Sequence, residues 1–470
     1  MVTRDLSRLA ALVVLSLAGG IPALCACQSS STDSAPAAPA ASIVVRRATP
    51  AAHASTLGAW LATGPELRAP RGVLADECAR RRRDLAAQLG GPCVVWVTSA
   101  PANNLSRFYQ SNDFYYLSGV EVADVALALH VDATGALADE VLFLPPKDVQ
   151  FETWNGARLS PGPEAETATG FRRTAPLGEE AEMLASWKAP TIYVIGTAPA
   201  TLPEGSQLSQ IAPGDGEDTP PSSVPLRAAL DALRLRKSDY EIDCLANAIT
   251  ITTFAMNEAA GAVRPGAFEY EPQGVLEGNF IRLGSERPGF NSIFGSGPNS
   301  CTLHYETNAR QMQDGDLLVM DVGAKWKYYS ADVTRTLPVN GRFTPRQREV
   351  YQAVLDAQTA AFQAARPGVT MHELDTIARQ VIDAKGFGPG RKYFKHGLGH
   401  WIGLYVHDAG EYGPIEPGML FTIEPGIYIN EESLGVRIED DYLMTENGAV
   451  KLSDGIPSEP DAIEALMAGR

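Results

Sequence analysis

The chain has 470 residues, 45% of them hydrophobic and 20% charged, as in a globular protein long enough for two or three domains. Its formal net charge of −17 argues against a nucleic-acid partner, because such a partner requires a basic stripe on the protein surface. The basic run at Arg80–Arg83 is expected to be the solvated face of a helix rather than a binding patch.

The N-terminus is predicted to be a leader rather than part of the fold. Two arginines precede an apolar run from Leu9 to Leu24, which is the pattern of a secretory signal peptide. The run is too short, and too interrupted by Gly and Pro, for a membrane span. It ends close to a bacterial lipoprotein cleavage box with Cys27 as the lipid-bearing residue, although Cys25 stands where a small residue is usual. We expect residues 1–27 to be a lipoprotein-like signal peptide; a plain export signal, or no signal, are the alternatives.

Residues 28–69 are expected to be a flexible tether, because the leader is followed by the low-complexity stretch QSSSTDSAPAAPAAS. A lipid on Cys27 is then the only predicted attachment of the chain to a membrane. The leader predicts export from the bacterial cytoplasm, either as a lipoprotein facing the periplasm or as a soluble periplasmic protein.

Four cysteines remain in the mature region, and none of them is in a CxxC spacing, so a zinc ribbon or a redox motif is not supported. In an exported protein these thiols either form disulfides or are buried and free, and the sequence leaves both alternatives open. The residues are Cys78, Cys93, Cys244 and Cys301.

Residues 70–222 are predicted to form an N-terminal domain of the α/β class. The pattern predicts a helix over about 79–88. Buried strands are expected at 93–100, 124–131, 140–146 and 191–197. Strands that alternate with helical stretches indicate an α/β layer. No group of catalytic residues is visible in this part of the chain.

A polar, Pro-rich segment at 213–225 marks the boundary to a second domain, residues 223–470. Three capping boxes predict helix starts here: Ser238 with Glu241, Thr344 with Gln347, and Thr370 with Glu373. Strand-like runs are found at 316–323, 331–339, 418–429 and 435–444. Helices followed by strands predict an α+β domain with a mainly antiparallel sheet.

Five side chains of the second domain are typical metal ligands: Asp321, Asp332, His400, Glu424 and Glu439. Four carboxylates and one imidazole converge only if a cation neutralises them, because unpaired buried carboxylates are strongly disfavoured. An oxygen-rich set with one nitrogen suits divalent Mn, Co or Zn. Since one hydrolytic ion does not normally take so many ligands, the set predicts two metal ions.

The sequence around each of the four acidic residues is compatible with a shared metal site but does not by itself require one. Asp321 and Asp332 lie on the two strands of a predicted hairpin whose turn falls near Lys325–Tyr328, which brings both side chains to one face. Taken singly, either aspartate is as well explained as a turn or cap residue. Glu424 is held at a strand end by the turn that follows it. Glu439 stands in a charge cluster that is normally solvated, but its apolar neighbours indicate a half-buried strand.

Three of the seven histidines, His396, His400 and His407, fall within 12 positions. The spacing of the first two resembles a helical zinc motif, yet Gly397 and Gly399 predict a loop or a strand instead. A lone histidine is more often a core residue, whereas three with flanking glycines favour a catalytic role.

Taken together and in order, these segments resemble the Xaa-Pro aminopeptidases (aminopeptidase P), in the family with prolidase, creatinase and methionine aminopeptidase. The likeness covers about 400 residues, from about residue 70 to the end. In the first domain it rests on QSNDFYYLSGVE, LFLPPKD and ETWNGARL. In the second it rests on RLRKSDYEI, LHYETN, TRTLPVNGRFTPRQRE, HGLGHWIGL, EPGIYI and VRIEDD.

The resemblance implies an α+β pita-bread catalytic domain preceded by an α/β N-terminal domain, with two divalent ions, most commonly Mn²⁺. It implies release of the N-terminal residue from peptides with proline second, by a hydroxide bridged by the two ions. Asp321 would chelate one ion, Asp332 and Glu439 would bridge, and His400 and Glu424 would complete the other ion's sphere.

The remaining roles also follow from the resemblance alone. Glu424 would manage the proton of the attacking water, and Arg437 would hold neighbouring carboxylates in register. His396 and His407 would stabilise the oxyanion and orient the substrate, with His304 lining the proline subsite.

Trp154 resembles a residue that approaches a neighbouring subunit's active site, which implies a homodimer or homotetramer; an ordinary core tryptophan is the alternative. Tyr405 departs from the family pattern, because Asp usually occupies its place. Prolidase, which cleaves Xaa-Pro dipeptides, remains an alternative activity, and a metal-free binding protein on the same fold is another.

Overall fold

The computed structural model describes residues 67–102, 107–211, 224–389 and 391–469, all of which belong to one compact unit. The predicted signal peptide, nearly all of the predicted tether and most of the Pro-rich boundary segment lie outside the described residues. The last residues of the predicted tether are described. There Arg68 exchanges two hydrogen bonds with the side chain of Asn247, at 3.0 and 2.8 Å. The two domain boundaries themselves stay predictions.

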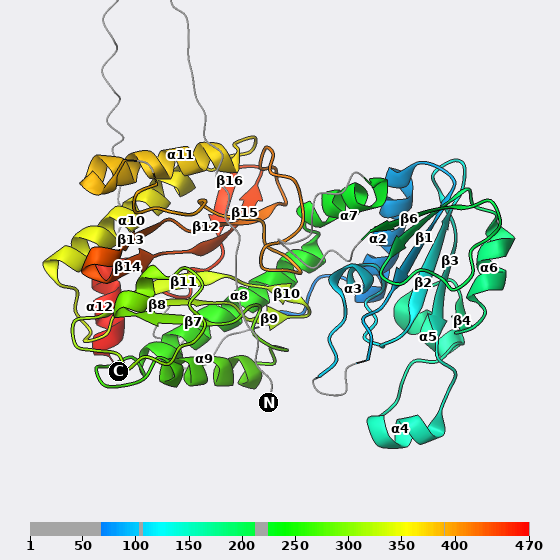
Figure 1. The fold of residues 1–470 in the computed structure, drawn as a ribbon, viewed down its shortest axis with the longest axis horizontal. Helices are drawn as coiled ribbons and strands as arrows, with labels where there is room; N and C mark the ends of the chain where they lie inside the picture. Colours follow the sequence, from blue (N-terminus) through cyan, green and yellow to red (C-terminus); the bar gives the residue numbers. More distant parts are fainter. Residues whose placement is uncertain (1–66, 103–106, 212–223, 390, 470) are drawn as a thin grey trace, which may run out of the picture. The chain divides into compact units, whose positions relative to one another are not determined.

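Six strands of the described residues form one mixed sheet in the N-terminal part of the chain, in the order β4-β3-β2-β1-β5-β6 (Figure 1). Its strands are β1 (Cys93–Thr98), β2 (Ala126–Val131), β3 (Leu137–Leu144), β4 (Thr174–Pro176), β5 (Thr191–Ile195) and β6 (Gln207–Ile211). β1 to β3 pair antiparallel, whereas β4, β5 and β6 join by parallel pairing. All four predicted strands are therefore present, and the α/β prediction is confirmed.

The helices that accompany this sheet are α2 (Leu74–Leu89), α3 (Asn112–Ser118), α4 (Val149–Asn155), α5 (Pro163–Thr169) and α6 (Glu180–Trp187). α2 covers the predicted helix and ends at Gly90, whose φ of 68° is a conformation that glycine adopts without strain. The interpretation of Arg80–Arg83 as a solvated face is wrong for Arg81 and Arg82, which are fully buried, whereas Arg83 is exposed.

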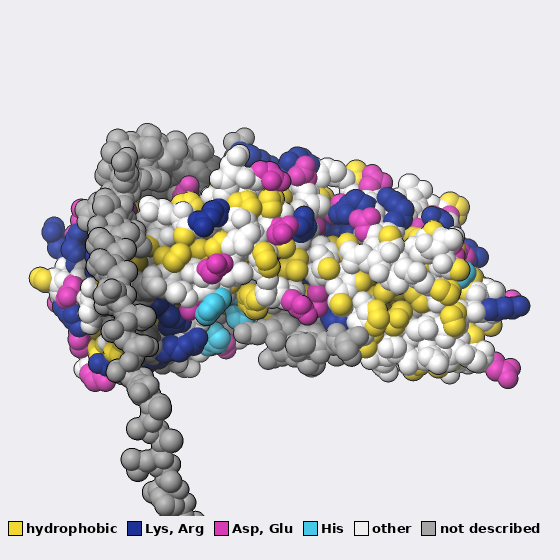
Figure 2. All heavy atoms as spheres, turned by 90° about the horizontal axis from the view of Figure 1, so that it is seen from above, with side chains coloured by type: hydrophobic (Ala, Val, Ile, Leu, Met, Phe, Trp, Pro, Cys, Tyr) yellow, Lys and Arg dark blue, Asp and Glu magenta, His cyan; other side chains and the backbone are white. Residues whose placement is uncertain are grey.

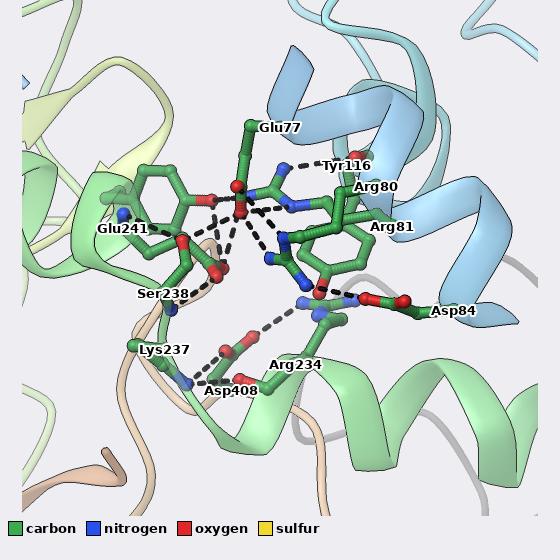
Figure 3. Close-up of polar contacts among 11 residues, drawn as sticks. Glu77, Arg80, Arg81, Asp84, Tyr116, Arg234, Lys237, Ser238, Glu241 and Asp408 are labelled. Carbon is green, nitrogen blue, oxygen red and sulfur yellow. Dashed lines mark hydrogen bonds and ion pairs between the residues drawn. The ribbon is translucent and has the colours of Figure 1, made fainter. Parts of the chain in front are cut away.

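Both buried arginines of α2 are paired. Arg82 Nε lies 2.7 Å from Glu140 Oε2 on β3. Arg81 donates to Glu77 and to the hydroxyl of Tyr329, and it lies 3.4 Å from Glu241 at the start of α8 (Figure 3). Removing one partner of such a buried pair costs about 3–5 kcal/mol, because the other charge is left without compensation. These arginines thus join α2 to its own sheet and to the following domain.

Three long helices of the second half begin where their capping boxes predict: α8 (Asp239–Ala260), α10 (Pro345–Ala364) and α11 (Met371–Ile382). In each box, the cap hydroxyl accepts from the third backbone amide while the Glu or Gln side chain accepts from the cap amide. α7 (Pro225–Leu235), α9 (Tyr270–Arg282) and α12 (Pro460–Ala468) were not predicted. α7 begins at the last residue of the segment interpreted as the boundary.

Strand pairing in this half is antiparallel, as predicted. One sheet contains β7 (Ile293–Ser296), β8 (Leu317–Val322) and β11 (Val333–Pro338), and β9 (Lys325–Trp326) pairs with β10 (Tyr329–Ser330). A second contains β12 (Leu420–Ile423), β15 (Asp440–Thr445) and β16 (Gly448–Lys451), while β13 (Gly426–Ile429) pairs with β14 (Leu434–Arg437). In Figure 1 these strands lie between α10 and α11 on one side and α8 and α9 on the other.

The described cysteines are free thiols, so the disulfide alternative is wrong for them. Cys78, Cys93 and Cys244 are buried and Cys301 is partly buried, and burial raises the pKa of Cys93 to about 11, which keeps that thiol protonated. None of the helices in the described ranges is both long and apolar enough to cross a membrane.

Candidate metal centre

The paired strands β8 and β11 deliver the first two acidic side chains. Asp321 lies in β8 opposite Thr334, and Asp332 directly precedes β11. The chain between them folds back through β9 and β10, and its turn residues Lys327 and Tyr328 have φ values of 48° and 72°. The predicted hairpin and its turn are therefore present, and both carboxylates are buried at one end of the sheet.

A second strand pair brings Glu424 and Glu439 to the same place. Ile423, the last residue of β12, pairs with Asp440, the first residue of β15. Glu424 and Glu439 are the next residues beyond this pair, so the register itself places them side by side. An isolated bridge between Thr334 and Glu439 joins this end to β11, beside Asp332.

His400 reaches the carboxylates from a loop that runs along β12. His400 donates its backbone N–H to Thr422 Oγ1 and accepts from the amide of Thr422. This approach requires Gly399, because a Cβ there would lie 2.1 Å from the Thr422 carbonyl oxygen. The segment lies outside the helices and strands, as its glycines predicted.

The imidazole of His400 faces three of the acids. Its Nε2 lies 3.4 Å from Asp332 Oδ2, 3.4 Å from Glu424 Oε1 and 3.8 Å from Glu439 Oε1. Its Nδ1 lies 3.0 Å from the Trp401 carbonyl oxygen, which can only accept, so Nδ1 carries the proton. Nε2 is therefore the ring nitrogen that faces the carboxylates, which is the arrangement of a metal-binding histidine.

The carboxylates also present free oxygens. Asp321 Oδ1, Asp332 Oδ1 and Glu439 Oε1 are buried and have no hydrogen-bond partner among the described residues. Ligand atoms of Asp332, His400 and Glu439 all lie within 4.8 Å of one another. Buried carboxylate oxygens without donors are strongly disfavoured unless a cation binds them. The donor set thus fits hard or borderline divalent ions.

The electrostatics of the cluster point the same way. Burial raises the pKa of Asp332 well above its usual value, and the charges of Asp321, Asp441 and Glu424 raise it further. Burial also raises the pKa of Glu439, with Asp332 and Glu424 adding to the effect. Without a cation, these two groups therefore hold protons that an ordinary carboxyl would have lost.

Arg437 connects the acids to His396. Its Nη2 pairs with Asp321 Oδ2 and its Nη1 donates to the Tyr428 hydroxyl at 2.9 Å. Tyr428 Oη in turn lies 2.8 Å from His396 Nε2, while His396 Nδ1 faces the Gly397 carbonyl oxygen at 2.8 Å. Burial, together with the charge of Arg437, lowers the pKa of His396 to about 3, so this ring is neutral.

All but one of the predicted site residues line a single cavity of about 680 Å³. The cavity includes the five predicted ligands together with His304, His396, His407 and Arg437. The ring of His407 lies 4.1 Å from that of His400. Histidine side chains also gather at the surface in the view from above, where basic and acidic groups are interspersed (Figure 2).

Trp154 is the exception, because it lies on α4 with 81% of its surface exposed and does not line the cavity. It is therefore not a core tryptophan in this chain. Tyr405, the departure from the family pattern, does line the cavity, and its backbone carbonyl accepts from the amide of Gly403 at 3.1 Å.

Sequence reasoning missed two residues that hold the ligands. Thr334 donates its hydroxyl to Glu439 Oε2 at 2.7 Å, and Tyr428 joins Arg437 to His396. The alternation of β11 gives a signal for Thr334, since it lies two positions from Asp332 on the same face. Tyr428 carried no such signal, because its contact depends on how β13 pairs with β14.

Comparison with known protein families matches residues 243–446 to Metallopeptidase family M24 and residues 78–193 to the aminopeptidase P N-terminal domain. Xaa-Pro aminopeptidase of Escherichia coli is 33% identical over 83% of this chain and 97% of its own length. Xaa-Pro aminopeptidase of Haemophilus influenzae is 36% identical over 77% and 88%.

Solved structures of aminopeptidase P are also similar to most of this chain. Proline aminopeptidase P II from Yersinia pestis has a TM-score of 0.75 at 31% identity, covering 84% of this chain and 100% of that one. Zn-substituted E. coli aminopeptidase P in complex with product has a TM-score of 0.76 at 31% identity, with 84% and 98% covered.

Replacing Asp332 by Asn tests the metal centre through stability. With chelator, Asp332→Asn should melt a few degrees above the wild type at high pH, where the wild-type carboxyl would have to carry a buried charge, and close to the wild type at low pH, where that carboxyl is protonated. With Mn²⁺ added, the wild type should gain more in melting temperature than the variant. Asp454→Asn, at an exposed aspartate, is the matched control.

The same melts give a pH dependence. The folded-state pKa of Asp332 and of Glu439 is raised. Without metal, their favourable contribution to the free energy of unfolding is therefore fully present below about pH 4, the usual carboxyl pKa. This contribution falls as the pH rises and the two groups lose their protons. The gain from metal should therefore grow with pH, because binding displaces those protons. An equal gain in wild type and Asp332→Asn at every pH would contradict the site.

Proposed function

This chain belongs to the Xaa-Pro aminopeptidases of metallopeptidase family M24, and from that premise we propose that it releases the N-terminal residue from peptides with proline at the second position. The single observation that carries the proposal is the convergence of Asp332, His400 and Glu439 inside one cavity, where buried carboxylate oxygens without hydrogen-bond partners surround the His400 Nε2. The enzyme is a metallo-aminopeptidase with a pita-bread catalytic domain.

The two predicted ions would be held by Asp321, Asp332, His400, Glu424 and Glu439. Divalent ions bound there supply Lewis-acid activation of the substrate carbonyl and of water. We propose Mn²⁺ as the most suitable ion, with Co²⁺ or Zn²⁺ as alternatives, because carboxylate oxygens outnumber the single imidazole nitrogen. A Zn-substituted relative with product is consistent with some tolerance among these metals.

Side chains of the protein carry out the remaining steps, which are proton transfer, oxyanion stabilisation and substrate positioning. Glu424 lies at the strand end beside His400, where its carboxylate takes a proton from water and returns one to the leaving amine. His407 lines the same cavity and donates to the developing oxyanion or orients the substrate. His396 also lines it and orients the substrate, since its Nδ1–H is directed at the Gly397 carbonyl oxygen. Arg437 fixes Asp321, and His304 lines the end of the cavity assigned to proline.

Peptide length separates this activity from that of prolidase, which cleaves Xaa-Pro dipeptides. With Mn²⁺ present, Xaa-Pro-Yaa tripeptides should be cleaved with a higher kcat/KM than Xaa-Pro dipeptides. Glu424→Ala should lower kcat by about 10²–10⁴-fold, because a positioned proton-transfer group is lost. The exposed Glu446→Ala is the matched control.

Three outcomes would each contradict part of the proposed function. A preference for dipeptides would assign the chain to the prolidase activity, and cleavage unaffected by Glu424→Ala would remove Glu424 from the mechanism. Activity that persists without any divalent ion would contradict the assignment as a metallopeptidase.

We further propose that the protein is a homodimer or homotetramer in which Trp154 contacts a neighbouring subunit. Trp154 and Val149 are large apolar side chains exposed at 81% and 70% on the short helix α4, which favours burial against another copy. Sedimentation of Trp154→Ala should give a smaller species than the wild type, whereas Tyr270→Ala, at an exposed residue of α9, should not. A monomeric wild type would contradict the proposal.

Export remains a proposal that rests on the leader sequence alone. We propose that Cys27 carries a lipid and that the enzyme faces the periplasm. Growth with labelled palmitate should label the full chain but not Cys27→Ser, and the variant should leave the membrane fraction. Unlabelled protein released to the soluble periplasm would instead favour a plain export signal.

A further inference from the structure

Lys325 is a buried cation whose hydrogen-bond partner is a backbone carbonyl. It begins β9, between Asp321 and Asp332, and only 1% of its surface is exposed. Its Nζ donates to the Leu404 carbonyl oxygen at 2.7 Å. Among the described residues it forms no salt bridge within 4 Å, although a buried ammonium normally has a carboxylate partner.

The groups that face this ammonium do not replace a partner. The ring of Tyr109 lies 5.1 Å from Nζ. Burial lowers the pKa of Lys325 to about 7, and the charges of Arg287 and Arg234 lower it further, against opposing effects of Glu286 and Asp408. An apolar side chain would fill the same space without this electrostatic cost. The lysine is therefore best explained by the hydrogen bond that it donates.

A second hydrogen bond also ties the β9–β10 hairpin to residues 401–408. The amide of Ser330, opposite Lys325 in the hairpin, donates to the Gly403 carbonyl oxygen at 2.8 Å. Two consecutive carbonyls of the loop, those of Gly403 and Leu404, are thus held by the chain segment that joins the two metal-binding aspartates.

The other end of the same loop is also held by buried charge. Asp408 pairs with Arg234 at 2.5 Å and with Lys237 at 3.2 Å (Figure 3). Its amide donates to the Trp401 carbonyl oxygen at 2.9 Å, which closes the loop on itself. The three residues between the two attachments, Tyr405, Val406 and His407, all line the cavity.

We propose that Lys325 is a positioning residue, which fixes the loop at Leu404 so that His407 and Tyr405 are held in the substrate cavity. The inference rests on the proposed aminopeptidase function, because it assigns a role to the loop in that reaction. Among the described residues, Lys325 neither lines the cavity nor hydrogen-bonds to a predicted metal ligand, so it would act through the backbone of residues 403–407.

Hydrogen–deuterium exchange tests this role without relying on activity. Lys325→Met, of similar length but without a donor, should speed exchange of the amides in residues 401–408 by about tenfold, the effect of losing one hydrogen bond to a charged group. Exchange elsewhere should stay as in the wild type. Lys327→Met, which removes the same charge two residues away, should leave the loop unchanged.

Kinetics give the second readout. In Mn²⁺ and with an Xaa-Pro-Yaa tripeptide, Lys325→Met should lower kcat about tenfold with KM within about threefold, because an oxyanion donor is misplaced rather than lost. Lys325→Gln, whose shorter side chain also withdraws the donor but stays polar, repeats the test where the Met variant does not fold.

The outcomes separate the two proposals. Loop exchange equal to the wild type, or faster exchange spread over the whole chain with a lower melting temperature, would show that Lys325 only stabilises the fold. A wild type that cleaves no Xaa-Pro peptide would sink the proposed function, while the exchange comparison would still decide the role of Lys325.

Discussion

The catalytic half of this protein is organised around one electrostatic constraint, a set of buried carboxylates with too few cations among the side chains. Arg437 pairs with Asp321, yet Asp332 and Glu439 face each other and His400 without a protein cation to neutralise them. One oxygen each of Asp321, Asp332 and Glu439 has no donor among the described residues. These carboxylates can ionise together only when cations bind them, so the arrangement of the strands and the metal requirement are linked.

Strand register is what makes the cluster rigid enough to bind metal. Asp321 and Asp332 are fixed by the pairing of β8 with β11, while Glu424 and Glu439 extend the pairing of β12 with β15. The bridge between Thr334 and Glu439 sets one sheet against the other. Because a shift by one residue would turn every ligand to the opposite face, the register specifies the site as strictly as the ligand residues do.

The helix starts and the ligand residues could be predicted from the sequence, because each depends on residues that are close together in the chain. The capping boxes at Ser238, Thr344 and Thr370 satisfy amides within three residues, so their helices could be predicted without tertiary information. Arg82 was misjudged because its partner is Glu140, 58 positions away on β3. The ligands were found by residue type and order, but which oxygens remain unpaired depends on pairing between sheets, which no local pattern contains.

The cavity is lined entirely by residues from 290–439. Residues outside this range nevertheless help to hold one of its loops in place. Arg234, at the end of α7, pairs with Asp408 on the site loop and with Asp113 on α3 in the N-terminal domain. The N-terminal domain therefore reaches the cavity through buried charge rather than by supplying a ligand. Lys325 and Ser330 hold the same loop from the metal side. The position of His407 is thus set by two independent attachments, one from the metal-binding hairpin and one through α7.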